Sequence, residues 1–104
     1  MLDEDIHVPH LLRVEVTQVI RRLVHAGDVS AERGGFALED LVDLDAVRHA
    51  HEPLLPLVWD LRANLTAYDA TYVALSLVLD APLVTSDAKL ARAPGLGAEI
   101  ILVS

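Results

Sequence analysis

The apolar positions of this chain follow two periodicities, one typical of helices and one typical of short strands. Helical spacing and end signals predict helices over 11–26, 30–42, 53–64 and 66–79, with a short helical segment from 87 to about 93. Short apolar or alternating runs predict strands over 5–9, 45–51, 83–84 and 98–103. The resulting order, β-α-α-β-α-α-β-α-β, predicts a single α/β domain spanning residues 1–104, with a mainly parallel sheet flanked by helices.

The first predicted helix carries a carboxylate at the edge of its apolar face. The apolar stripe consists of Leu12, Val16, Val19 and Leu23. Glu15 projects about 60° from the centre of this stripe, and the residues three and four positions after it are not basic. A carboxylate in this position either binds a cation from another element or reaches water at the boundary, and helix geometry leaves both interpretations open.

Two aspartates lie at the ends of neighbouring elements. Thr66 and Asp69 have the spacing of a capping box, which places Asp69 in the first turn of an apolar helix. Asp87 follows a short strand and precedes a helical turn, at the end of a strand where open α/β sheets bind ligands. Each aspartate alone is explained by helix capping. Their occurrence as a pair favours a functional site.

Composition narrows the chemistry. The 104 residues include no cysteine, so a metal here requires oxygen or imidazole ligands. The net charge of −8 argues against a broad basic nucleic-acid surface, although bound cations invert the charge of an acidic site. No apolar run reaches the ~20 residues of a membrane span and the first residues are acidic, so we expect a cytoplasmic protein without membrane association.

Other candidate residues have simpler interpretations. His49 and His51 share one face of a predicted strand, but a solvated edge strand is favoured over a metal site because acidic or histidine partners are lacking nearby. Trp59 lies at helical spacing from Leu55 and Arg62, which favours core or interface packing over ligand stacking.

Glu15, Asp69 and Asp87 together would form the oxygen-rich set of ligands that Mg²⁺ or Mn²⁺ prefers. Metal ions held in this way activate water for attack on a phosphodiester and stabilise the leaving oxygen. The three acids therefore suggest metal-dependent phosphodiester hydrolysis. The alternative is a small α/β domain in which all three acids are caps or surface groups.

Three segments carry a resemblance to a known family. In order, they resemble the second, third and fourth acidic motifs of PIN-domain ribonucleases of the VapC toxin type: Pro9–Val16, Asn64–Leu75 and Ala81–Leu90. Ala93-Pro94-Gly95 and the last predicted strand are similar to the usual ending of the family. The resemblance runs from about Pro9 to Val103 and implies a PIN-like three-layer fold.

The resemblance implies an Mg²⁺- or Mn²⁺-dependent endoribonuclease of a VapBC-type toxin-antitoxin system, often a homodimer, inhibited when a cognate antitoxin inserts a segment into the acidic cleft. By matching motifs, the metal ligands and catalytic residues are Glu15, Asp69 and Asp87. Supporting hydroxyl groups come from Thr85 and Ser86, and Arg22 and Arg62 are candidates for phosphate contact or for surface ion pairs.

The sequence departs from this family at its beginning. The family opens with a central strand that carries the first catalytic aspartate, whereas neither Asp3 nor Asp5 follows an apolar strand. We therefore expect a fold without its N-terminal central strand. The chain is then a fragment, a product of a misassigned start, or a shortened relative with impaired chemistry. The alternative function is a catalytically inactive domain that binds an antitoxin or another partner.

Overall fold

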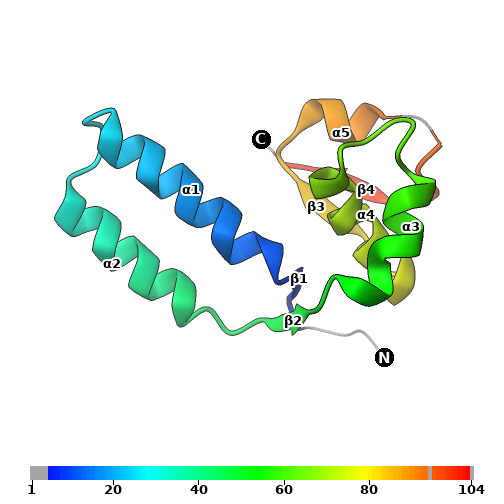
Figure 1. Ribbon diagram of the computed structural model, residues 1–104, viewed down its shortest axis with the longest axis horizontal. Coiled ribbons are helices and arrows are strands. Elements are labelled where there is room, and N and C mark those ends of the chain that lie inside the picture. The colour runs from blue at the N-terminus through cyan, green and yellow to red at the C-terminus, as the bar shows by residue number, and fades with distance from the viewer. Residues whose placement is uncertain (1–4, 94, 104) are drawn as a thin grey trace. The chain divides into compact units, whose positions relative to one another are not determined.

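A computed structural model of the chain describes residues 5–93 and 95–103, so Asp3 and Pro94 lie outside the described residues. Its elements are β1 (His7–Pro9), α1 (Leu11–His25), α2 (Ala31–Val42), β2 (Val47–His49), the 3₁₀ turn η1 (Glu52–Leu54), α3 (Leu55–Asp60), α4 (Ala67–Leu79), β3 (Leu83–Thr85), α5 (Ala88–Arg92) and β4 (Ile100–Leu102) (Figure 1). This mixture of helices and strands, in the predicted order, confirms the α/β class. The chain divides into two compact units, with the boundary between Arg48 and His49.

The first unit is built around a helical hairpin of α1 and α2 (Figure 1). Gly27, at φ +83°, allows the left-handed turn after α1. Ser30 caps α2 because its hydroxyl accepts the backbone N–H of Arg33 at 3.2 Å. Beside the hairpin, β1 pairs with β2, next to a backbone hydrogen bond of 2.8 Å from Val47 to Ile6.

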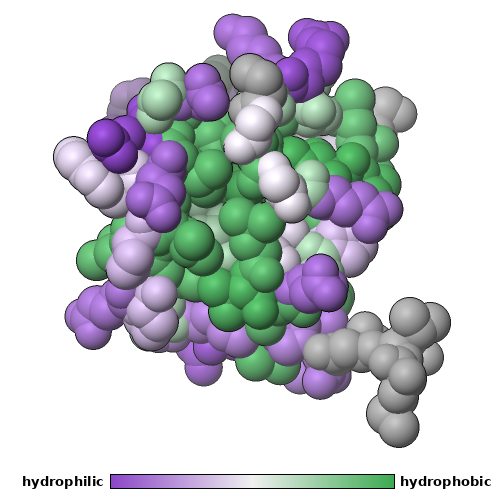
Figure 2. All heavy atoms as spheres, turned by 90° about the vertical axis from the view of Figure 1, so that its right-hand side faces the viewer, coloured by the Kyte–Doolittle hydropathy of each residue, from purple (hydrophilic) through white to green (hydrophobic). Residues whose placement is uncertain are grey.

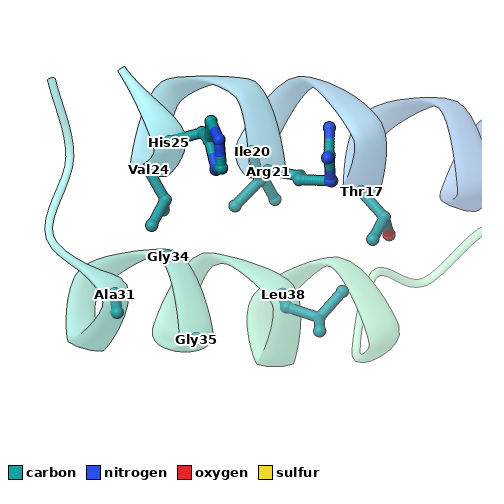
Figure 3. Close-up of a pocket in the computed structure, with 9 residues that line it drawn as sticks. All are labelled: Thr17, Ile20, Arg21, Val24, His25, Ala31, Gly34, Gly35 and Leu38. Carbon is teal, nitrogen blue, oxygen red and sulfur yellow. The ribbon is translucent and has the colours of Figure 1, made fainter. Parts of the chain in front are cut away.

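The two helices of the hairpin meet at Gly34. A Cβ atom at this position would lie 2.8 Å from Cγ2 of Val24 and 3.3 Å from Cγ2 of Ile20. Figure 3 shows the side chains of Val24 and Ile20 directed from α1 toward α2. The predicted stripe is therefore not the face that contacts α2: Val19 and Leu23 on it remain 47% and 40% exposed. The contacting face lies about 100° further around the helix, where the missing side chain of glycine allows close approach.

Replacing Gly34 with alanine is expected to destabilise the hairpin relative to the same change at Gly35. The new methyl group at position 34 must displace a stiff valine side chain, and such overpacking costs about 1–3 kcal/mol. At position 35 a Cβ meets nothing within 4 Å, so Gly35→Ala gains about 0.5–1 kcal/mol of helix propensity. Urea unfolding of both variants measures the difference; equal free energies of unfolding would contradict the close packing.

The second unit is organised around α4, where the described buried residues are Ala70, Thr71, Val73, Ala74, Leu75 and Ser76. One side of this helix packs with the 3₁₀ turn and α3, in a cluster that includes Leu54 and Leu75. Another side packs with Leu90 and Leu96 through Val73, which is fully buried. A helix that is apolar around most of its circumference is therefore enclosed by its neighbours.

The second unit also contains a parallel strand pair. β3 and β4 pair in register, with Leu83 opposite Ile100 and Thr85 opposite Leu102. Their parallel arrangement agrees with the predicted sheet type, and α5 supplies the crossover between them. Among the described residues, no helix has the length and hydrophobicity needed to cross a membrane.

One helix boundary differs from the sequence prediction. The helix expected over residues 53–64 consists of the turn η1 followed by α3, which ends at Asp60. Leu61 already departs from helical ψ, and a short turn leads to Thr66. On this short helix Trp59 is 65% exposed, so it does not pack in the core. The other predicted role, packing at an interface, stays a prediction.

Candidate functional site

Asp69 lies in the first turn of α4. The hydroxyl of Thr66 accepts the backbone N–H of Asp69 at 3.2 Å, which confirms the predicted N-cap. The side chain of Asp69 is half-buried, on a helix whose following residues form the core of the unit. The core thus anchors the backbone that presents this carboxylate.

Asp87 lies at the carboxyl end of β3 and is the N-cap of α5. Its Oδ1 accepts the backbone N–H groups of Lys89 at 2.9 Å and Leu90 at 3.3 Å, while the hydroxyl of Thr85 accepts the backbone N–H of Asp87 at 3.1 Å. The capping interpretation is therefore confirmed for this residue. The side chain is exposed, and the described residues place no hydrogen-bond donor on its Oδ2. One oxygen caps the helix, and the other takes no part in the capping.

The topology of the second unit brings these two aspartates to the same end. Three residues, Asp80 to Pro82, join α4 to β3, and the helix contacts the strand. A helix that returns into an adjacent strand through so short a connection runs antiparallel to it, so the beginning of α4 and the end of β3 lie at one edge. Asp69 and Asp87 stand at those two positions.

Glu15 belongs to the other unit. It lies on α1 and is half-buried, as its place beside the apolar stripe predicted. Within neither unit do three or more histidine, aspartate or glutamate side chains of the described residues come together as a metal-binding group. The grouping of Glu15 with Asp69 and Asp87 therefore stays a prediction.

The supporting residues have different environments. Ser86 is exposed between the strand and the cap, and Arg22 is exposed in the last turn of α1. Arg62 is also exposed, and its guanidinium lies 4.4 Å from the ring centroid of Trp59. Helical spacing in the sequence had placed Trp59 beside Arg62, but only the structure shows that the indole next to this guanidinium is exposed.

The ligand atoms that these residues offer match the preference of a hard divalent cation. Carboxylate oxygens dominate, and the sequence contains no thiolate ligand. The Oδ2 of Asp87 is suited to such an ion, because capping of α5 uses only the other oxygen. The residues present therefore fit a metal of the Mg²⁺ or Mn²⁺ type in their chemistry.

Comparison with protein families shows to which family the chain belongs. A model of the PIN domain matches residues 1–96 of the chain. The chain belongs to the PIN-domain family. Its α/β elements are thus those of a PIN domain.

Individual relatives place this PIN domain among the VapC-type proteins. It is 48% identical over 105 residues to Ribonuclease VapC1 of Mycobacterium tuberculosis H37Rv, covering 99% of the chain and 79% of that protein. It is 41% identical over 87 residues to Ribonuclease VapC9 of the same strain, covering 84% of the chain and 68% of the relative. It is 35% identical over 101 residues to Ribonuclease VapC12 of that strain, covering 97% of the chain and 78% of the relative. The resemblance inferred from three acidic motifs is confirmed.

Proposed function

We propose that this VapC-type PIN domain is an Mg²⁺- or Mn²⁺-dependent endoribonuclease, the toxin of a VapBC-type pair. The observation that carries the proposal is its 48% identity to Ribonuclease VapC1 over 99% of the chain. We assign Glu15, Asp69 and Asp87 as metal ligands. A bound divalent ion supplies an activated water and stabilises the charge of the leaving oxygen.

The contribution of the protein itself is to hold the acidic groups in place. The N-cap at Thr66 and the buried body of α4 support Asp69. The hydroxyl of Thr85 supports the turn that presents Asp87 by accepting its backbone N–H. Ser86 is assigned a hydroxyl contact near the same edge. These are positioning roles, which reduce the freedom of the carboxylates before substrate binds.

Two arginines are assigned to the RNA backbone. Arg22 and Arg62 are both exposed on a chain whose net charge is −8. Guanidinium groups bind phosphate oxygens in a bidentate manner, and a few such groups suffice to orient a strand that the acidic surface otherwise repels. Their contacts to phosphate would fix the register of the substrate.

The partners that we propose are a cognate antitoxin and a second copy of the chain. Apolar side chains on the hairpin remain exposed, among them Val14 at 69%, Phe36 at 57% and Val42 at 64%. Between α1 and α2 lies a groove of about 290 Å³, lined by Ile20, Val24 and Leu38 among others (Figure 3). Exposed apolar surface of this kind is typical of protein-binding faces. Light scattering at micromolar concentration tests the homodimer.

The test of the enzymatic function is cleavage of a mixed RNA pool by the 104-residue chain. With Mn²⁺ or Mg²⁺ we expect cleavage that EDTA stops and that Asp69→Asn loses. Cleavage that persists in EDTA, or in the Asp69→Asn variant, would overturn the proposed metal mechanism. A folded chain that cleaves no RNA in either metal would overturn the enzymatic function.

A second candidate function is antitoxin binding without RNA cleavage. It is favoured by one observation: apolar side chains of the hairpin, among them Val14 at 69% and Val42 at 64%, remain exposed as on a protein-binding face. This function predicts that binding to the antitoxin persists when Glu15→Gln, Asp69→Asn and Asp87→Asn are combined. Loss of partner binding in a folded triple variant would contradict it.

A further inference from the structure

The second unit exposes an aromatic ring, that of Trp59, against which the guanidinium of Arg62 is packed. Trp59 is 65% exposed, and the guanidinium of Arg62 lies 4.4 Å from the centroid of its ring. Nη1 of Arg62 also donates a hydrogen bond of 3.0 Å to the carbonyl oxygen of Trp59. This bond holds the arginine above the ring, so the pair is ordered in advance and loses little side-chain entropy when a ligand binds.

A pocket of about 370 Å³ adjoins this pair. It is lined by Leu55, Val58, Trp59, Arg62, Leu65 and Ala67. Its volume falls at the lower end of the range for small-ligand sites, which suits a single planar ring system. Figure 2 looks onto one face of the second unit. Apolar side chains gather on this face, and polar side chains surround them.

The lining combines a flat apolar surface with one positive charge. Arg62 is the charged residue among those lining this pocket, and its charge is opposite to the net charge of the chain, −8. A nucleotide matches both features, because its base stacks on an indole and its phosphate pairs with a guanidinium. One lining residue, Ala67, begins α4, two residues before Asp69.

We propose that Trp59 and Arg62 form a nucleotide-binding subsite for single-stranded RNA, with a base stacked on the indole and the adjoining phosphate on the guanidinium. This assignment rests on the proposed action on RNA and adds the residues that hold the strand beside Asp69. The stacking is tolerant of base identity, since every base presents a flat face. The subsite therefore positions RNA without selecting its sequence.

Trp59 is the single tryptophan of the chain, so its fluorescence reports on the subsite directly. We would titrate the full chain, in EDTA, with 2′-O-methyl hexanucleotides that resist cleavage. We expect saturable quenching of the indole. Anisotropy of labelled hexamers should show binding about 5- to 150-fold weaker for Trp59→Ala and within about threefold of wild type for Trp59→Phe.

Arg62→Ala should lower the slope of log affinity against log salt by about 0.7, the value for one phosphate contact on a single strand. The matched control is Val78→Ala, which truncates a 57% exposed apolar side chain near the other end of α4 and should leave RNA affinity unchanged. Circular dichroism of each variant confirms that it is folded.

Three results would overturn the subsite: no quenching by any hexamer, equal affinity in wild type and Trp59→Ala, or an effect of Val78→Ala as large as that of Trp59→Ala. Light scattering provides a further check. If wild type is a dimer and Trp59→Ala a monomer with unchanged RNA affinity, the pocket is a self-association surface and the proposal fails.

These outcomes separate the subsite from the enzymatic function. If wild type and Trp59→Ala cleave RNA with equal kcat/KM, the enzymatic function is supported and the subsite is contradicted. If the chain cleaves no RNA but shows quenching and an affinity that depends on Trp59, the subsite is supported and the enzymatic function is contradicted.

Discussion

Replacing Asp87 with asparagine is expected to reduce metal-dependent RNA cleavage by at least about 100-fold while the chain remains folded. The substitution removes a negative charge from the proposed metal site, where stabilisation of the transition state is worth several kcal/mol, and about 1.4 kcal/mol corresponds to tenfold in rate. Asparagine caps helices about as well as aspartate, so α5 keeps its hydrogen bonds. Single-turnover cleavage and thermal unfolding of the same samples measure the two effects.

Asp87→Ala separates capping from chemistry. Alanine cannot accept the backbone N–H groups of Lys89 and Leu90, so this variant should also lose about 0.5–2 kcal/mol of stability. Cleavage should be reduced to a similar extent in both variants. If Asp87→Asn instead cleaves like wild type and only Asp87→Ala is impaired, the role of Asp87 is restricted to capping.

Asp80→Asn is the matched control for the loss of one negative charge. Asp80 is exposed at the opposite end of α4 and has φ +49°, a left-handed conformation that asparagine adopts readily. This variant should cleave RNA within about twofold of wild type and should be as stable. An equal loss of activity in Asp80→Asn and Asp87→Asn would show that net charge, and not a specific ligand, explains the effect.

Leu54→Ala is expected to destabilise the second unit by about 2–5 kcal/mol. Leu54 is 3% exposed and packs in the cluster that contains Val58 and Leu75, so truncation leaves a cavity that the enclosed helix α4 cannot readily fill. For a chain of this size the loss corresponds to a midpoint of thermal unfolding lowered by at least about 8 °C. Thermal and urea unfolding measure the loss.

The neighbouring Leu55 provides the control for this change. It has the same side chain but is 51% exposed, so Leu55→Ala should cost less than about 1 kcal/mol. A similar loss of stability in the two variants would contradict the placement of Leu54 in the core and of Leu55 at the surface.

Local signals in the sequence identified most of the elements and the two candidate aspartates of the second unit, Asp69 and Asp87. The N-caps at Ser30 and Thr66 and the turn at Gly27 depend on residues only a few positions apart, so their patterns can be read directly. The same holds for Asp87, whose capping bonds reach only three residues ahead. The order of the acidic motifs was sufficient to indicate the PIN family, which the match over residues 1–96 confirms.

The tertiary structure decided which surfaces are covered. Periodicity showed that α1 is amphipathic, but the close approach at Gly34 selected the face of Ile20 and Val24 over the predicted stripe. Helical spacing likewise placed Trp59 beside apolar residues, and only the packing of η1 and α3 against α4 left its ring at the surface. Local sequence determines where a helix begins and how its side chains are spaced. Which side is buried depends on the shape of distant partners, so these features required the fold.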